Sequence, residues 1–548
     1  MTQLTYRLDI KRSSYTMPTI LWLILALIVA SILLVIITET VNSIRLKNEL
    51  PTLWDNIKPL EKFTRPNSRH DYQYELYKDN YDTYSLIDDK TWNDLDMPKL
   101  FSVMNFNFTA IGEMRLVCAL RQMKKINNEK LFHVFNENNS TRNFVAYHLA
   151  KIGKSIYPTF PDQLQPVKRN NFYMLAPYLP LIAIIITLFN TGLGIMLLFL
   201  VCIYNMALSG MLKRTYIDDL NSMFYNSTVV NKAYKLSNSE ELPDIDVDFK
   251  HFIVARRFSW LLGKASTDND AFTVIGFIKM LLMIDYFLFH LIQSSFKRHE
   301  DEVLVCYDYI AMLDNHYSVA LWRKSLDFYS VPETTTEDKV AFDDLVHPLL
   351  NGAVPNSLTL DFNMLLTGSN ASGKSTFMKA LAVNLLLAQS VNTTTAQHFV
   401  YKPGLIYTAM VNQDSITSGD SYFMTELKSI NRLFEIPQNQ NVYCFIDEIF
   451  KGTNTTERIA ASESVLSYLD DSEQFTIIAA THDIELADLL KDKYHNYHFN
   501  ESIMDNEIHF DFTIKNGKAD TRNAIELLRI TKFPHFIYER AKHNVKGK

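Results

Sequence analysis

Two long stretches of the chain contain no charged residue, and both have the length of membrane-spanning segments. Residues 18–38 (PTILWLILALIVASILLVIIT) would cross a bilayer once as a helix, because about 20 apolar residues span its hydrocarbon core. Residues 170–212 are about twice as long as one crossing, and Asn190 and Gly192 supply turn residues near the middle. We therefore predict an N-terminal transmembrane helix and a transmembrane hairpin over about 172–211. The alternatives are a cleaved signal peptide and a helical hairpin buried in a soluble core, respectively.

Charged residues near these stretches predict their orientation across the membrane. Basic pairs at 168–169 and 213–214 flank the hairpin, so the positive-inside rule places both of its ends in the cytoplasm. Three crossings would then leave the N-terminus outside. A third apolar region, 271–295, contains Lys279 and Asp285. Because ionisable residues are costly inside a bilayer, we predict a packed soluble helix there, with a further membrane helix as the alternative.

The rest of the chain shows first a helical and then a strand-like pattern. Residues 41–92 are polar and weakly periodic, and we expect a linker with short helices. From Asp94 onwards, and again over 215–329, apolar residues recur every three or four positions, as in amphipathic helices. The clearest of these apolar positions are Leu100, Val103, Met104, Ile111, Met114 and Val117. Beyond Pro332, short apolar runs alternate with helical segments, which predicts an α/β domain with a largely parallel sheet over 336–548. The expected strands are 364–367, 405–411, 442–446 and 476–480.

Composition narrows the functional classes only slightly. A net charge of −7 and a pI near 6.1 lack the overall basic character of a nucleic-acid-binding protein, although a local basic surface stays compatible with them. The four cysteines show no Cys-x-x-Cys spacing, so we expect packed thiols in a reducing compartment, and neither a zinc site nor a disulfide framework. These cysteines are Cys118, Cys202, Cys306 and Cys444.

A glycine-rich loop carries the strongest chemical signal. Residues 363–367 read as a buried strand, and an apolar helix follows the loop, which is the context that the pattern G-x-x-x-x-G-K-S requires. The loop residues are Gly368, Ser369, Asn370, Ala371, Ser372, Gly373, Lys374, Ser375 and Thr376. The glycines allow backbone amides to wrap a phosphate chain beside a helix N-terminus. Lys374 is expected to reach the β- and γ-phosphates of ATP, and the Ser375 hydroxyl to bind Mg²⁺.

Two further strand ends supply the other groups that hydrolysis needs. An apolar run over 442–446 ends in Asp447 and Glu448, which predicts Asp447 beside Mg²⁺ and Glu448 as the group that orients or deprotonates water. A strand over 475–480 leads into His482, which suits a γ-phosphate sensor because imidazole can donate a hydrogen bond. Taken alone, each pattern also fits a strand capped by solvated polar residues.

Together these segments resemble the MutS family of mismatch-repair ATPases. Residues 367–376 (TGSNASGKST) are similar to the family pattern T-G-P-N-M-S-G-K-S-T. Residues 447–455 (DEIFKGTNT) look like D-E-I-G-R-G-T-S-T, and 480–486 (ATHDIEL) look like A-T-H-x-x-E-L. Residues 418–426 (SGDSYFMTE) are similar to G-x-S-T-F-M-x-E, in which the equivalent of Ser421 approaches the γ-phosphate bound by the other subunit.

The resemblance covers 300–548 well and about 93–165 loosely. It implies an α/β P-loop NTPase domain of the ABC/MutS type at 336–548, with ATP and Mg²⁺ as cofactors and a homodimer as the working form. A mostly α-helical domain like the MutS core would precede it over 93–335, interrupted by the transmembrane hairpin. Residues 1–40 would hold a tail and the first membrane helix, and 41–92 the linker.

The chain differs from the family in the regions with which MutS proteins contact DNA. MutS proteins carry an N-terminal mismatch-reading domain with a Phe-x-Glu wedge, followed by a connector domain, and the resemblance includes neither. Phe135-Asn136-Glu137 has the letters of the wedge but lies within the helical region, and we interpret it as coincidence. By position, the apolar hairpin replaces the clamp with which MutS proteins touch DNA.

The sequence therefore favours a membrane-anchored MutS-like ATPase, in a bacterial inner membrane with its ATPase domain in the cytoplasm. Hydrolysis at a composite dimer site would drive a conformational change toward the lipid-embedded hairpin and an unidentified protein partner. One alternative is a DNA-binding mismatch-repair or recombination protein tethered to the membrane. Another is a transporter ATPase of the ABC type, although no L-S-G-G-Q signature precedes Asp447.

Overall fold

The computed structural model describes residues 17–56, 87–154, 167–262, 274–369, 372–410, 422–437, 440–504, 507–519, 528–530 and 533–546. The chain divides into two compact units. The first, which we call the helical unit, consists of Met1–Asn56, Phe108–Ile111 and Glu137–Asp314. The second, which we call the sheet unit, consists of Ile57–Asn107, Gly112–Asn136 and Asn315–Lys548.

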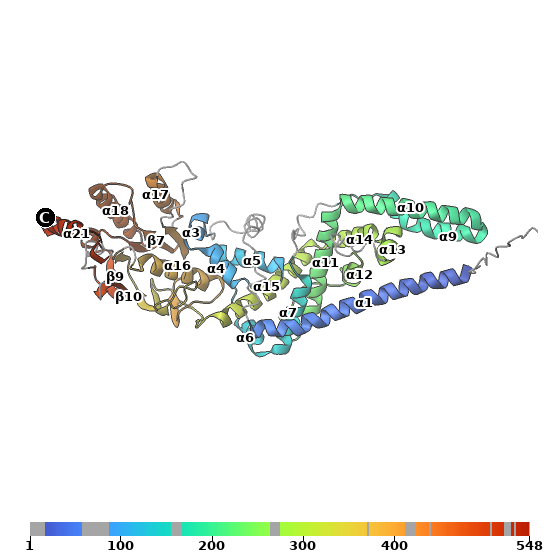
Figure 1. Ribbon diagram of the computed structural model, residues 1–548, viewed down its shortest axis with the longest axis horizontal. Helices are drawn as coiled ribbons and strands as arrows, with labels where there is room; N and C mark the ends of the chain where they lie inside the picture. Colours follow the sequence, from blue (N-terminus) through green and yellow to red (C-terminus); the bar gives the residue numbers. More distant parts are fainter. Residues whose placement is uncertain are drawn as a thin grey trace, which may run out of the picture. The chain divides into compact units, whose positions relative to one another are not determined.

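The described part of the helical unit consists mainly of helices (Figure 1). They are α1 (Met17–Asp55), α7 (Asn139–Ile152), α8 (Asn171–Leu175), α9 (Leu179–Phe189), α10 (Thr191–Thr215), α11 (Ile217–Ser237), α12 (Ile253–Leu262), α13 (Val274–Leu281), α14 (Ile284–Arg298) and the first part of α15 (Glu300–Ser325). A short 3-10 turn, Ala176–Tyr178, joins α8 to α9.

Helix α1 is longer than the apolar stretch at its start. It continues to Asp55, so residues 41–55, which the sequence pattern assigns to a linker, extend the helix. The reason is packing: Leu50 and Trp54 lie four residues apart on one helical face and are 2% and 3% exposed. Arg142 of α7 stacks over the Trp54 ring at 4.3 Å, which fixes this end of α1 against α7.

Helices α9 and α10 form the helix–turn–helix that the apolar stretch predicts, and they lie side by side in Figure 1. Asn190 ends α9 and caps α10, its side chain accepting a hydrogen bond from the Leu193 amide at 3.1 Å. A Cβ atom at Gly194 would lie 2.3 Å from Thr187 Cα, so the two helices approach too closely for any side chain there. Within the described residues, Asn171–Phe189 and Thr191–Thr215 are long and apolar enough to cross a membrane by length and composition.

The third apolar region does not form one helix. Its residues 271–273 lie outside the described part of the chain, and the rest forms α13 and α14, separated at Met283, whose φ is +50°. Lys279 Nζ lies 3.0 Å from Asp285 Oδ1, so the two charges pair across the turn. Helices of 8 and 15 residues are too short to span a bilayer. The packed helix favoured by the sequence is therefore two packed helices.

The base of the hairpin is attached to these two helices. Asn205 on α10 is fully buried, and its amide donates to the carbonyl oxygens of Ala176 at 2.9 Å and Leu281 at 2.7 Å. An apolar cluster surrounds this contact; its members are Met174, Ala176, Leu208, Leu212, Met283 and Tyr286. One end of the hairpin thus has a core of its own within the helical unit.

The sheet unit contains a six-stranded sheet of order β10-β9-β4-β8-β7-β6. Its strands are β4 (Met364–Thr367), β6 (Leu405–Ala409), β7 (Val442–Asp447), β8 (Phe475–Ala480), β9 (His495–Met504) and β10 (Glu507–Asn516). All neighbouring pairs are parallel except β9 and β10, which confirms the largely parallel sheet that the sequence predicts. The carboxyl ends of β4, β7 and β8 consequently meet at one edge.

A second sheet and several helices complete the sheet unit. The four-stranded sheet has the order β1-β5-β2-β3, with β1 (Glu333–Thr334), β2 (Val340–Leu345), β3 (Asn356–Leu360) and β5 (His398–Tyr401). The helices include α3 (Asp89–Asp94), α4 (Met97–Met104), α6 (Glu129–Glu137), α16 (Lys374–Ser390), α17 (Tyr422–Asn431), α18 (Thr455–Asp470), α19 (Ile484–Leu489) and α21 (His535–Lys546). Helix α16 follows β4 and is buried along nearly its whole length, so the loop before it is held on both sides.

The apolar positions predicted for the amphipathic helices are buried, with one exception. Leu100 and Met104 face the core from α4, and three of the predicted residues do so from α5 (Ala110–Arg121). Val103 is 46% exposed. The buried residues of α4 are Met97, Leu100, Phe101 and Met104. This spacing of three, four and seven residues leaves position 103 on the opposite face.

Candidate functional site

The glycine-rich loop runs between β4 and α16, and two of its positions require glycine. Gly368 has φ of +139°, and a Cβ atom there would lie 3.0 Å from both Phe499 O and Ser372 Oγ. Gly373 has φ of +107° and caps α16. The loop therefore passes close to β9 with its backbone turned toward the helix N-terminus. Asn370 and Ala371, the central residues of the predicted motif, lie outside the described residues.

Lys374 is folded back over this loop. The residue is 3% exposed, and its Nζ donates to the carbonyl oxygens of Gly368 and Ser369, each at 2.7 Å. Burial lowers the pKa of Lys374, and the nearby carboxylates of Asp447 and Glu448 oppose this shift. A buried cation is thus held against the backbone of the loop.

Ser375 and Asp447 meet at the next position along the edge. Burial raises the pKa of Asp447, and the nearby Ser375 hydroxyl opposes this shift. Asp447 ends β7 opposite Ala480 of β8, so three sequence segments contribute to one edge. A hydroxyl and a carboxylate side by side provide the hard oxygen ligands that Mg²⁺ prefers. The exposed Thr376 follows in α16.

Glu448 occupies a strained backbone position and makes two charged contacts. Its φ is +58°, and its amide donates to Ala480 O at 3.0 Å. His482 Nδ1 lies 3.1 Å from Glu448 Oε1, and Lys451 pairs with Glu448 Oε2. The His482 contact is the main reason why the pKa of Glu448 is lowered to about 2. Glu448 and His482 therefore lie in contact, and a carboxylate so acidic orients water better than it accepts a proton.

Three residues that the sequence analysis did not select hold these groups in place. Glu426 on α17 accepts hydrogen bonds from the Lys451 and Gly452 amides, both at 3.2 Å. Arg458 on α18 forms a bidentate pair with Asp483, with two contacts of 2.7 Å, and so fixes the residue next to His482.

On the other side of the loop, Glu501 of β9 accepts a hydrogen bond from the Ser369 hydroxyl. The sequence gives only a weak signal for these contacts. Glu426 is the last residue of the 418–426 segment, whereas Arg458 and Glu501 stand outside every motif.

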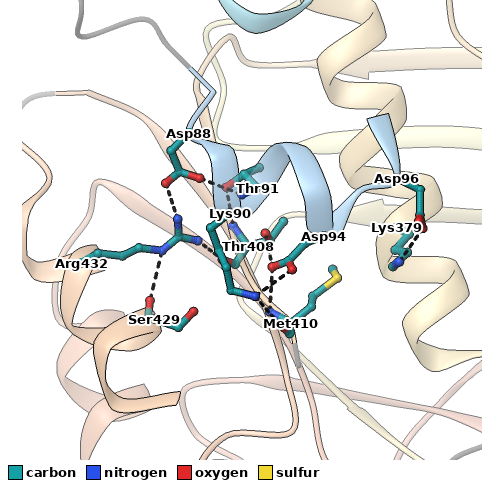
Figure 2. A network of polar contacts seen from close by, with 10 residues as sticks. All are labelled: Asp88, Lys90, Thr91, Asp94, Asp96, Lys379, Thr408, Met410, Ser429 and Arg432. Carbon is teal, nitrogen blue, oxygen red and sulfur yellow. Dashed lines mark hydrogen bonds and ion pairs between the residues drawn. The ribbon is translucent and has the colours of Figure 1, made fainter. Parts of the chain in front are cut away.

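A polar network attaches α3 to the end of β6 (Figure 2). Arg432 donates to the Thr408 carbonyl and pairs with Asp88. Asp94, which is fully buried, accepts from the Thr408 hydroxyl at 2.8 Å and from the Met410 amide at 3.1 Å. Met410 is the last described residue before 411–421, so this network fixes the point from which that segment departs. Ser421, the predicted in-trans residue, lies outside the described residues.

Three of the four cysteines are packed thiols, as expected, and Cys202 is partly exposed. All are free, and Cys118, Cys306 and Cys444 are buried. Burial raises the pKa of each of these three to about 12, so none is a reactive thiolate near neutral pH.

Comparison with known proteins assigns the region that carries the site. The family model described as MutS domain V matches residues 364–547, from the first residue of β4 onwards. This part of the chain therefore carries a domain of the MutS family. The matched region contains the glycine-rich loop, the Asp447-Glu448 pair and His482.

Curated MutS proteins resemble the chain over part of its length. The DNA mismatch repair protein MutS of Streptococcus thermophilus is 28% identical over 271 residues, which cover 47% of this chain and 32% of the relative. The MutS protein of Streptococcus suis is 32% identical over 196 residues, covering 34% and 23%, respectively. That of Acetivibrio thermocellus is 26% identical over 289 residues, covering 50% and 33%. The chain spans about a third of the length of the curated relatives it matches.

Proposed function

We propose that this MutS-family chain is a Mg²⁺-dependent ATPase anchored in a membrane, and that it works as a homodimer. The observation that carries the ATPase is the meeting of Lys374, the Ser375–Asp447 pair and Glu448 at one sheet edge. A cation, a pair of oxygen ligands and a water-orienting carboxylate are the groups that phosphoryl transfer to water needs.

The residues at this edge fit ATP with Mg²⁺. The loop backbone is cradled at Gly368, where a Cβ atom would fill the space, and Ser375 and Asp447 already lie together as oxygen ligands. Lys374 would contact the β- and γ-phosphates, and Ser375 with Asp447 would hold Mg²⁺, which supplies charge neutralisation for the phosphates. Glu448 would orient the attacking water, and His482 would donate to the terminal phosphate.

The resting contacts of these groups also suggest what ATP must change. Lys374 has to leave the Gly368 and Ser369 carbonyl oxygens, and Glu448 has to exchange part of its contact with Lys451 for water. In the homodimer, the segment containing Ser421 would approach the γ-phosphate bound by the partner subunit. Closing of the dimer would then couple ATP, through Thr408 and Met410, to α3.

The membrane anchor rests on the exposed surface of the hairpin. A core helix of a soluble protein can pass the same test of length and composition, but only 22% and 17% of the apolar windows of the two spans are buried inside the protein. The exposed apolar side chains include Leu181, Ile182, Ile185, Leu188, Phe189, Ile195, Phe199, Leu200 and Ile203. A continuous apolar surface of this extent fits lipid and not water. This supports a membrane location, and we propose the bacterial inner membrane, with the ATPase domain in the cytoplasm.

The relatives' names favour a second candidate, a tethered protein that binds DNA in mismatch repair or recombination. Two observations weigh against direct mismatch reading. Phe135 of the wedge-like tripeptide is fully buried and stacks edge-on against Tyr317 at 5.8 Å, so it cannot insert between bases. The net charge of −7 adds no general attraction for phosphates. A duplex-binding titration in which affinity falls steeply with salt, for matched or mismatched DNA, would favour this candidate instead.

The ATPase is tested by turnover of the full chain purified in detergent. Lys374→Ala should abolish ATP binding and hydrolysis, because no other described cation is buried at the loop. Lys491→Ala, which removes an exposed lysine of the same unit, is the matched control and should leave turnover unchanged. Turnover by Lys374→Ala equal to that of the control would refute the assigned site.

A further inference from the structure

Two histidines and a glutamate of the helical unit converge where three helices begin or end. His251 precedes α12 by two residues, His299 is the C-cap of α14, and Glu302 lies in the first turn of α15. The Nδ1 atoms of His251 and His299 lie 2.9 Å and 3.0 Å from the same oxygen, Glu302 Oε1. One ligand atom from each residue lies within 4.8 Å of the others. We call these three residues the His-His-Glu cluster.

The surroundings of the cluster position its ligand atoms. Phe252 is fully buried and stands edge-on to both imidazole rings, at interplanar angles of 80°, so it forms an apolar floor. The Asp248 amide donates to Glu302 Oε2 at 3.1 Å, which orients the carboxylate. Asp248 Oδ2 lies 4.0 Å from His251 Nε2, so a second carboxylate is near. The side chains of His251, His299 and Glu302 are 37%, 24% and 24% exposed, which leaves an entry path from solvent.

We propose that the His-His-Glu cluster binds one divalent transition-metal ion, and that Zn²⁺ fits it best. Zn²⁺ takes imidazole nitrogen and carboxylate oxygen at about 2.0–2.2 Å, which puts neighbouring ligand atoms of a tetrahedral site about 3.3 Å apart. The observed separations of 2.9 Å and 3.0 Å need to widen by only a few tenths of an ångström. Nitrogen ligands disfavour Ca²⁺ and Mg²⁺, which take oxygen.

Binding requires a defined change in the two rings. Their centroids are 3.7 Å apart and their planes differ by 14°, so they are stacked. A metal ion lies in the plane of each imidazole that it binds, and the rings therefore have to fan apart about their Cβ–Cγ bonds. This torsion is broad and soft. Water or Asp248 completes the coordination, and the amide contact to Glu302 serves as the outer support that ligating carboxylates commonly have.

The consequence of binding is a fixed junction inside the helical unit. The ion would join the segment before α12 to the turn between α14 and α15, positions that are now connected by hydrogen bonds and ring contacts. All three ligands belong to the helical unit, so the site does not depend on the ATPase proposed above.

Zinc titration of the full-length protein tests the site. The protein is purified in detergent with a tag that lacks histidine, treated with a chelator, and titrated with ZnCl₂ by calorimetry and by thermal unfolding. Wild type should bind one equivalent and unfold at a higher temperature with Zn²⁺. The double variant His251→Gln/His299→Gln and the single variant Glu302→Gln should bind at least about tenfold more weakly and lose the thermal shift. His133→Gln, at an exposed position of α6, should behave as wild type.

The same measurements can overturn the proposal. Absence of Zn²⁺ binding by wild type, or equal affinity in wild type and Glu302→Gln, refutes the site. Circular dichroism before titration identifies any variant that does not fold. In that case X-ray absorption at the zinc edge of the loaded wild type decides: two imidazole nitrogens with carboxylate oxygen support the site, and any other ligand set overturns it.

Discussion

Polar and apolar side chains are placed in opposite ways in two regions of the molecule. One is the edge of the six-stranded sheet that carries the glycine-rich loop, and the other is the α9–α10 hairpin. At the sheet edge, charged residues are withdrawn from water: Lys374 is 3% exposed, and the Glu448 side chain is 12% exposed. On the hairpin, apolar residues face outward: Leu188 and Phe189 are 81% and 88% exposed. Both arrangements cost free energy in a water-soluble fold, the first through desolvation and the second through hydrated apolar surface.

The two regions differ in what compensates these costs. Each buried charge at the sheet edge has a partner within the protein, as in the Glu448–His482 and Glu448–Lys451 contacts. Within the described residues, the outward side chains of the hairpin have no comparable protein covering. The charges at the sheet edge are therefore compensated within the protein, whereas the exposed surface of the hairpin fits the membrane proposed above. Four predictions test this contrast.

The largest effect is expected when the charge at the sheet edge is removed without changing its shape. Glu448→Gln should slow ATP hydrolysis at least about 100-fold, because a neutral amide lacks the negative charge that orients the attacking water, while ATP affinity stays within a few-fold of wild type. Single-turnover kinetics and equilibrium ATP binding measure the two effects. Glu473→Gln, at an exposed position of the same unit, is the control. Equal hydrolysis rates in the two variants would contradict the role of Glu448.

The next largest effect concerns a charge added to the hairpin. Leu200 on α10 and Leu489 at the end of α19 are 53% and 57% exposed, so the two positions are matched in exposure. Leu200→Arg should cost about 2.5–3.5 kcal/mol of membrane insertion, whereas Leu489→Arg should cost none. The measurement is the fraction that resists alkaline extraction from membranes. If both variants remain equally membrane-bound, lipid does not cover the hairpin surface around Leu200.

A smaller effect is expected at the buried polar contact of the hairpin base. Asn205→Leu removes both donors to Ala176 O and Leu281 O and should lower the free energy of unfolding by about 2 kcal/mol. Denaturation in mixed micelles measures the change. Asn516→Leu, an exposed control at the end of β10, should change stability by less than about 0.5 kcal/mol. A loss no larger than that of the control would mean that the contact does not hold the hairpin base.

The smallest effect is a dependence of stability on pH. The folded-state pKa of Glu448, about 2, lies below its ordinary value of 4.5, so the ionised form stabilises the fold above about pH 4.5. That contribution is lost as the pH falls through this range toward 2. The stability gap between wild type and Glu448→Gln should therefore shrink from about pH 6 to about pH 3. A gap that does not change with pH would show that the His482 and Lys451 contacts are not formed in solution.

The strands and the loop were predictable because their signals are local. Central parallel strands are buried on both faces and read as continuous apolar runs, which is why β4 matches its predicted range and β7 and β8 differ from theirs by one residue. The predicted strand 405–411 is two residues longer than β6. Lys374 and Glu448 follow these strand ends directly, so their convergence follows from the parallel order.

The rest of the site could not be predicted, because it depends on contacts between distant residues. Arg432 and Asp88 are separated by 344 positions, and Arg458 reaches Asp483 only after α18 and β8 have folded. The ends of the helices could not be predicted from the sequence either. Nothing local to residues 41–55 shows that α7 will cover Leu50 and Trp54, and the break at Met283 reflects the pairing of Lys279 with Asp285 across a turn.

The length of α1 has a mechanical consequence. An unbroken helix of 39 residues measures about 58 Å, roughly twice the hydrocarbon thickness of a bilayer. Its apolar start and its buried end at Trp54 therefore belong to one continuous, stiff helix. Pro51, the proline inside the helix, lies only about one turn from its C-terminal end. A tilt imposed where Trp54 packs against α7 would be carried along the helix axis without a hinge. Any rearrangement of the helical unit that tilts this end of α1 would thus also tilt the segment that we propose to lie in the membrane.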